Sequence, residues 1–131
     1  MEFKEIIKAV EQFHDAFKIQ NNYKPTAAIG QDQIELRHRL MHEENEEYLQ
    51  AAKDGDIVEI ADALGDQLYI LCGTILKHGL QHKIVEVFEE IQRSNMSKLD
   101  KDGNPIYRED GKVMKSELYF KPDIAKILAN D

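Results

Sequence analysis

Two acidic segments with helical spacing restrict the fold of this chain more than any other feature. Their acids are Glu43, Glu44, Glu46 and Glu47 in the first segment and Glu59, Asp62 and Asp66 in the second. On a helix, Glu44 and Glu47 share the arc that carries Leu40, and the acids of the second segment fall on one side. Carboxylates on a core-facing arc are costly unless a cation pairs with them. The simplest missing partner is a divalent metal ion held by oxygen ligands.

A solvated acidic face is the alternative interpretation of the same residues. It accounts for Asp56 at a helix start and for Glu43 and Glu46. It does not account for Glu44 and Glu47 on the apolar arc, or for Asp62 and Asp66 deep in the third helix. Two bare carboxylates about 5 Å apart repel by about 3 kcal/mol at an effective dielectric of about 20. Because all-carboxylate sites favour hard cations, we expect Mg²⁺, with Mn²⁺ as the substitute. His38 and His42 offer a zinc alternative, but they face away from this arc and lack a third ligand.

Composition limits the class of protein. The chain has 131 residues, 42% of them hydrophobic and 32% charged, which is typical of one globular domain. No apolar run is long enough to cross a bilayer, and the single cysteine, Cys72, excludes disulfide scaffolds and thiolate zinc sites. We therefore expect a cytoplasmic protein without a membrane partner. The net charge of −8 argues against binding to a nucleic acid polymer.

Hydrophobic periodicity predicts an all-α fold. Helices are expected at about residues 2–20, 32–53, 56–78 and 83–95, forming an antiparallel bundle within residues 1–97 of a single domain, 1–131. Asp56 is the expected N-cap of the third helix, and Gly55 and Gly79 are expected to end the second and third. The third helix carries apolar residues on several faces, which predicts a homodimer or homotetramer.

The remaining segment, about residues 98–131, differs from the bundle. Asp102-Gly103 and Asp110-Gly111 are tight-turn sequences, and lysines are frequent between and after them. We expect an irregular or hairpin-like basic arm, followed by a short last helix at about 123–129. A metal held by the acids beside such an arm would suit a small polyanion such as a nucleotide.

The ordered set of motifs resembles a known superfamily. Glu44-x-x-Glu47 followed by Glu59-x-x-Asp62 is similar to the paired acidic motifs of the all-α NTP pyrophosphatases, and more specifically of MazG-like proteins. The run 59–69 leading to Gly73-Thr74, then the segments 94–98 and 110–115, continue the likeness. The resemblance spans roughly residues 33–125 and implies an all-α nucleotide pyrophosphohydrolase.

The resemblance also implies an activity and a set of residue roles. A nucleoside triphosphate would be hydrolysed between its α and β phosphates, giving a monophosphate and pyrophosphate. Glu44 would be the general base and a metal ligand, with Glu47, Glu59 and Asp62 as the other principal ligands. The auxiliary acids are Glu43 and Asp66, and the expected substrate contacts are Asn95, Lys98, Lys112 and Lys115. Because Glu43 and Glu44 form a doublet, either could be the primary ligand.

Two other functions remain open at this point. Phosphoribosyl-ATP pyrophosphatase shares the acidic motifs but acts on a different nucleotide. A non-catalytic helical regulator or oligomer subunit would use the same helices without turnover. Neither the preferred base and sugar nor the choice between dimer and tetramer is encoded in a motif.

Overall fold

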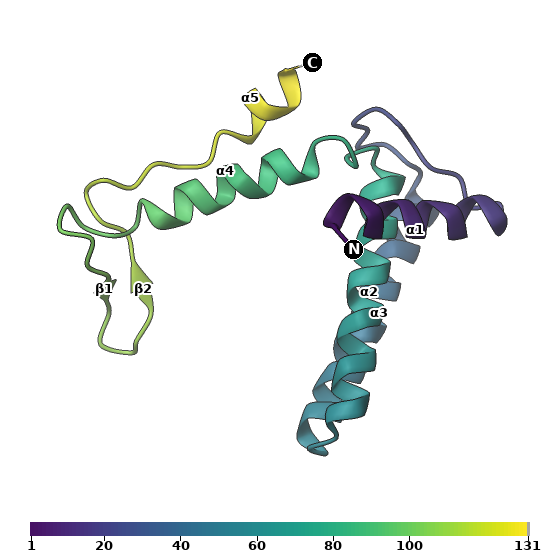
Figure 1. Cartoon of the computed structure of the whole chain (residues 1–131), viewed down its shortest axis with the longest axis horizontal. Coiled ribbons are helices and arrows are strands. Elements are labelled where there is room, and N and C mark those ends of the chain that lie inside the picture. The colour runs from purple at the N-terminus through teal and green to yellow at the C-terminus, as the bar shows by residue number, and fades with distance from the viewer. Residues whose placement is uncertain (131) are drawn as a thin grey trace. The chain divides into compact units, whose positions relative to one another are not determined.

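The computed structural model describes residues 1–130, and within them the fold is all-α, as the sequence predicts. The helices are α1 (Phe3–Ala16), α2 (Gln31–Lys53), α3 (Ile57–Lys77), α4 (Ile84–Met96) and α5 (Ile124–Ala129), with two short strands, β1 (Ile106–Tyr107) and β2 (Val113–Met114) (Figure 1). None of the helices in this range has the length and apolar character that a membrane crossing requires.

The chain divides into two compact units, Met1–His82 and a second that begins at Lys83. The boundary precedes α4, whereas the sequence places the end of the bundle near residue 97. The single domain expected from chain length stays a prediction.

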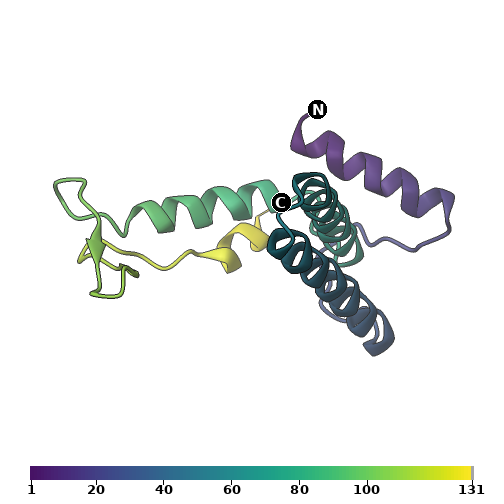
Figure 2. The same cartoon turned by 90° about the horizontal axis from the view of Figure 1, so that it is seen from below.

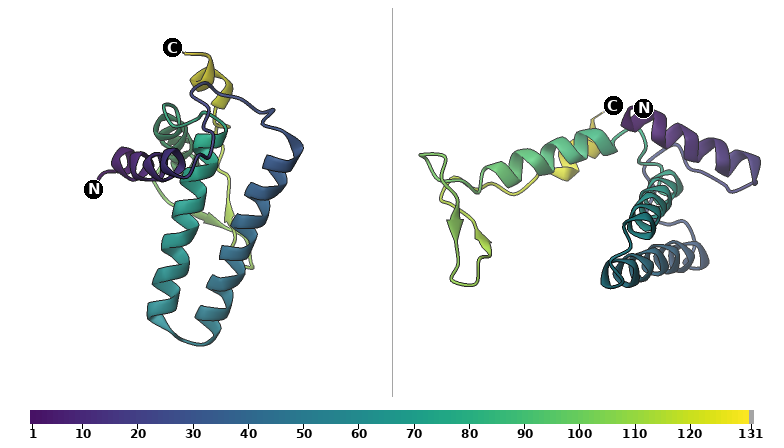
Figure 3. Two further views of the ribbon diagram at one scale, coloured as in Figure 1. Left: turned by 90° about the vertical axis from the view of Figure 1, so that its right-hand side faces the viewer. Right: turned by 60° about the horizontal axis from the view of Figure 1, so that its bottom comes forward.

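In the first unit, α2 and α3 form an antiparallel hairpin with a tight connection (Figure 3). Gly55 has a φ of 66°, which allows the chain to reverse directly after α2. The Asp56 side chain then accepts hydrogen bonds from the backbone N–H groups of Val58 and Glu59, which confirms the expected N-cap. The connection therefore sets which residues of the two helices lie opposite each other.

Helix α1 packs against α3 and is shorter than predicted (Figure 2). It ends at Ala16 because Lys18 adopts a left-handed conformation, with a φ of 60°. The Ile19 N–H then donates to the carbonyl of His14 at 2.8 Å, the pattern of a Schellman C-cap. The apolar residues up to Phe17 suggested a longer helix, since nothing in their spacing marks Lys18 as a cap.

The core of the first unit is small. Its buried apolar residues are Ile7, Val10, Ala51, Ala63, Cys72, Ile75 and Leu76. Cys72 is a free, buried thiol, as expected for a small core residue. Other apolar residues of α3 stay exposed, among them Leu64 and Leu71 at 48% and 47%. The first unit therefore leaves apolar surface on α3 uncovered.

The second unit contains α4, the hairpin and α5. Its strands pair antiparallel, with Ile106 opposite Met114 and Tyr107 opposite Val113, around a turn that contains Gly111. Buried Glu90 on α4 accepts hydrogen bonds from Arg93 and from the backbone N–H of Asp123, just before α5. The hairpin-like arm and the last helix are thus both present.

Candidate metal and catalytic site

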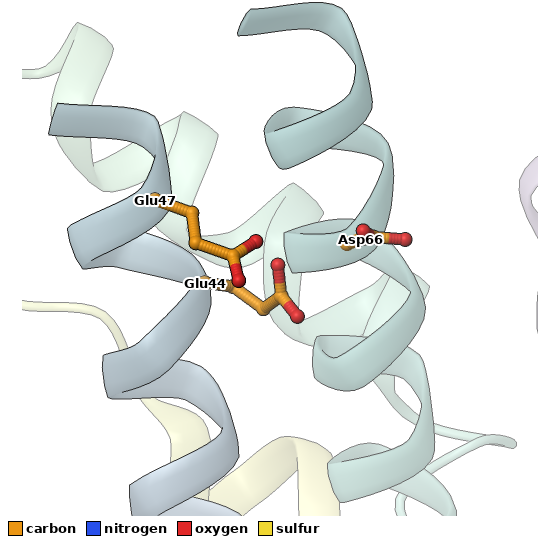
Figure 4. A group of neighbouring side chains, drawn as sticks. All are labelled: Glu44, Glu47 and Asp66. Atoms are coloured by element: carbon orange, nitrogen blue, oxygen red, sulfur yellow. The ribbon is translucent and has the colours of Figure 1, made fainter. Parts of the chain in front are cut away.

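Three carboxylates come together on the facing surfaces of α2 and α3. Glu44, Glu47 and Asp66 each offer an oxygen atom, and these oxygens lie within 4.8 Å of one another. Figure 4 shows Glu44 and Glu47 extending from α2 toward α3, which carries Asp66. The Gln67 side chain donates to Asn45 Oδ1 at 3.1 Å, which ties the two helices together at the level of Glu44 and Asp66. Residues 22 positions apart in the chain thereby form one acidic group.

The Glu44 carboxyl is held in an unfavourable environment for a negative charge. Burial, followed by the neighbouring Glu47 carboxyl, raises the pKa of Glu44 to about 7. The charges of Asp66 and Asp62 act in the same direction. Glu44 Oε2 is buried without a hydrogen-bond partner among residues 1–130. An oxygen in this position, beside two further carboxylates, fits a hard divalent cation such as Mg²⁺.

The other two predicted ligands lie beside this group. Glu59 and Asp62 line a cavity of about 420 Å³ near the α2–α3 connection, and Glu47 lines it as well. Glu47 therefore belongs both to the three-carboxylate group and to the wall that carries Glu59 and Asp62. The structure groups Asp66 with Glu44 and Glu47, whereas the sequence ranked Asp66 as auxiliary and Glu59 and Asp62 as principal ligands. The ranking of the ligands stays a prediction.

Comparison with known proteins defines the family. A model of the phosphoribosyl-ATP pyrophosphohydrolase family matches residues 10–95, most of the chain, including both acidic helices. The chain belongs to this family. Comparison with curated proteins gives no match for the chain. The phosphoribosyl-ATP pyrophosphohydrolase family fits within the all-α NTP pyrophosphatases, which also include MazG, so the broad resemblance seen in the motifs is confirmed.

The remaining acid, Glu43, and the histidine pair both lie outside the three-carboxylate group. Glu43 is exposed and lies outside the three-carboxylate group, whereas its neighbour Glu44 lies inside it. His38 and His42 stack with ring centroids 6.3 Å apart, and both are exposed. In the part of the chain that the structure describes, no third ligand joins this pair.

The predicted substrate contacts of this pyrophosphohydrolase family member all lie in the second unit. Asn95 and Lys112 are exposed, and the Lys115 ammonium lies 4.7 Å from the centre of the Tyr119 ring. Lys98 is half-buried near the end of α4. The approach of these four residues to the acids of the first unit stays a prediction.

Sequence reasoning missed one feature of the first unit, a group of buried bases. Arg37 and Lys77 are each only 6% exposed, and His14 is 3% exposed. Arg37 could have been noticed, because it stands on the same helical arc of α2 as Leu40 and Glu44. His14 could have been noticed in the same way, because it stands four residues after Val10 and seven after Ile7 on the apolar arc of α1. Lys77 has no comparable mark in the sequence.

Proposed function

We propose that this chain is a Mg²⁺-dependent nucleoside triphosphate pyrophosphohydrolase, which converts a (d)NTP and water into a (d)NMP and pyrophosphate. The observation that best supports this function is the half-buried Glu44, whose Oε2 is buried without a hydrogen bond among residues 1–130 and lies beside Glu47 and Asp66. Membership of a pyrophosphohydrolase family supports the type of bond that is cleaved.

The acids of α2 and α3 would hold the metal. Glu44 and Glu47 would bind it from α2 and Glu59 and Asp62 from α3, with Asp66 and Glu43 as auxiliary groups. Bound Mg²⁺, or Mn²⁺ in its place, would offset the phosphate charge. Glu47 supports this set of ligands, because its carboxylate lies within 4.8 Å of that of Asp66 and it also lines a cavity with Glu59 and Asp62.

Glu44 would act as the general base. It would accept a proton from a water molecule whose oxygen attacks the α-phosphorus, while the bond from that phosphorus to the bridging oxygen breaks and pyrophosphate leaves. A carboxyl whose pKa is raised to about 7 can both take and release a proton near neutral pH. That value describes Glu44 without a cation beside it, and a bound cation would lower it.

Four residues of the second unit are the proposed contacts to the substrate. Asn95 would donate a hydrogen bond to the base or sugar, and Lys98, Lys112 and Lys115 would neutralise phosphate oxygens. The exposure of Lys112 and Lys115 leaves their ammonium groups accessible to a ligand.

Self-association into a homodimer or homotetramer is part of the proposal. Leu64 and Leu71 on α3 are nearly half exposed, and Leu68 between them is 37% exposed. An apolar strip of this kind on a helix is usually covered by another subunit. Light scattering at micromolar concentration should give a mass of at least twice 15.1 kDa.

Phosphoribosyl-ATP pyrophosphatase is the second candidate, and the family match favours it. Its substrate also carries a triphosphate, so the same acids would serve the same bond cleavage. A cytoplasmic location would suit either nucleotide.

One assay tests both candidates. Pyrophosphate release is measured with added inorganic pyrophosphatase across common and damaged (d)NTPs and phosphoribosyl-ATP, with Mg²⁺ or with EDTA. We expect Mg²⁺-dependent release by the wild-type chain and none by Glu47→Gln. Preference for phosphoribosyl-ATP would select the second candidate. Equal background with both proteins on every substrate would contradict the enzyme proposal and support a non-catalytic role.

A further inference from the structure

Within residues 1–130, the buried bases of the first unit form no ion pair. Arg37 comes from the N-terminal half of α2, and Lys77 is the last residue of α3. The ion pairs within residues 1–130 are Arg93–Glu90 and Arg108–Asp110, both in the second unit. Buried charges without a counterion are strongly unfavourable, because burial removes water without supplying an opposite charge. A protein with a net charge of −8 that buries two unpaired cations therefore requires an explanation.

Neutral oxygens hold the two cations in place. Arg37 Nε donates to Thr74 Oγ1 at 3.1 Å, and its Nη2 donates to the carbonyl of Ile70 at 2.9 Å. Lys77 Nζ donates to the carbonyl of Gln20 at 2.7 Å. These bonds orient the guanidinium and the ammonium, but dipoles do not cancel their charge. The remaining donors of both groups are available to a further acceptor.

The surrounding residues make room for this arrangement. A Cβ at Gly73 would lie 2.5 Å from Arg37 Nη2 and 3.0 Å from His14 Nε2. His14 Nδ1 is hydrogen-bonded to Asn21 Oδ1 at 2.6 Å. Burial is the main cause that lowers the pKa of His14, and the charges of Arg37 and Lys77 act in the same direction. A neutral His14 leaves a local charge of about +2, from Arg37 and Lys77.

The two cations open onto a cavity of about 600 Å³. Lys18, in its left-handed cap conformation, also lines it, as do the apolar side chains of Ile29, Leu36 and Leu40. This volume lies in the range of sites for small molecules. The wall thus combines a doubly charged end with apolar surface, which suits a small molecule that has a phosphate at one end.

We propose that this cavity binds a phosphate monoester, whose dianion is the counterion of Arg37 and Lys77. A phosphate matches the charge of the pair better than a carboxylate does, and it accepts hydrogen bonds from both the guanidinium and the ammonium. The site does not require a metal ion. The cavity shares no residue with the three-carboxylate group. Phosphate binding here can therefore be tested independently of the pyrophosphohydrolase proposal.

Calorimetric titration in EDTA, at fixed ionic strength, tests the site with inorganic phosphate and ribose 5-phosphate as probes and ribose as the uncharged comparison. We expect saturable binding of both phosphates and none of ribose. Arg37→Met and Lys77→Met should each weaken binding by about tenfold or more, since each removes charged hydrogen bonds. Arg39→Met and Lys53→Met, which replace exposed bases of α2, are the matched controls, and these variants should bind phosphate as the wild type does.

Further measurements separate the alternatives. Glu47→Gln should retain phosphate affinity in EDTA even if it loses all turnover, which distinguishes this site from the acidic one. Circular dichroism checks the fold of each variant, and Lys77→Met serves if Arg37→Met does not fold. Absence of saturable phosphate binding by the wild-type chain, or equal loss in the control variants, would overturn the proposal. The two cations would then be clamps for the carbonyls of Ile70 and Gln20 only.

Discussion

The acidic group and the basic cavity of the first unit share helix α2 but are charged in opposite senses. Glu44 and Glu47 face α3 together with a third carboxylate, and Glu44 keeps an oxygen without a hydrogen bond. Arg37 stands two turns earlier on the same arc and donates hydrogen bonds to two neutral oxygens, yet has no counterion within residues 1–130. Helix α2 thus carries one acidic and one basic group that each lack a partner among residues 1–130. Burial, rather than residue type alone, distinguishes these two charged groups from the exposed acids and bases of the same helix.

The largest expected effect is on the acidic side of this comparison. Glu47→Gln and Asp62→Asn should each lower kcat/KM by at least about a hundredfold, because each removes the charge of a proposed metal ligand. The fold should survive, and in EDTA the Tm should rise, because neutral isosteres relieve repulsion between the acids. Glu46→Gln, an exposed acid outside the group, is the control. Full activity in both variants would show that the proposed site is wrong.

Substitutions at two glycines of α3 test how the helix accommodates the buried Arg37 guanidinium. Gly73→Ala should destabilise the protein by about 1–2 kcal/mol, because the new methyl group would meet Arg37 Nη2 at 2.5 Å. Gly65→Ala, which has no atom within 4 Å of its Cβ position, should instead stabilise it by roughly 0.5–1 kcal/mol. Urea unfolding in EDTA measures both. If the two variants shift stability in the same direction, Gly73 is not needed to accommodate the guanidinium.

Substitutions in the basic arm test whether residues outside the first unit bind the phosphates of the substrate. Lys112→Ala combined with Lys115→Ala should raise KM for the triphosphate about tenfold, which corresponds to about 1.4 kcal/mol of lost binding. Mg²⁺ affinity should change little, since neither lysine belongs to the acidic group. Lys121→Ala, another exposed lysine, provides the control. Unaltered KM and kcat in the double variant would assign the arm a structural role.

A pH dependence is also expected in the metal-free protein. The pKa of Glu44 is raised to about 7 by burial and by Glu47, from an ordinary value of 4.5. The folded state therefore binds more protons than the unfolded state between these values, so stability should fall as pH rises from about 4.5 to 7. Thermal unfolding in EDTA should show this slope, flattened in Glu44→Gln and kept in Glu46→Gln. A slope identical in both variants would exclude Glu44 as its source.

Local chemistry made most helix positions predictable. Asp56 follows Gly55 and precedes an apolar run, and the structure shows it capping α3. The Asp-Gly turns and the last helix follow from the same kind of short-range pattern. The end of α1 did not, because Lys18 takes a left-handed conformation that a lysine rarely adopts without a tertiary reason.

The sequence by itself determined the all-α class and the arc on which Glu44 and Glu47 lie, because both follow from residue types at helical spacing. Its ordered motifs indicated the superfamily, and the family model identified the family within it. Tertiary structure decided that Asp66 shares their group, since the axial register of α2 against α3 depends on packing and on the turn at Gly55. It also decided the burial of Arg37 and Lys77. Helical periodicity gives the direction of a side chain around its own axis, but only the neighbouring helices determine what covers it.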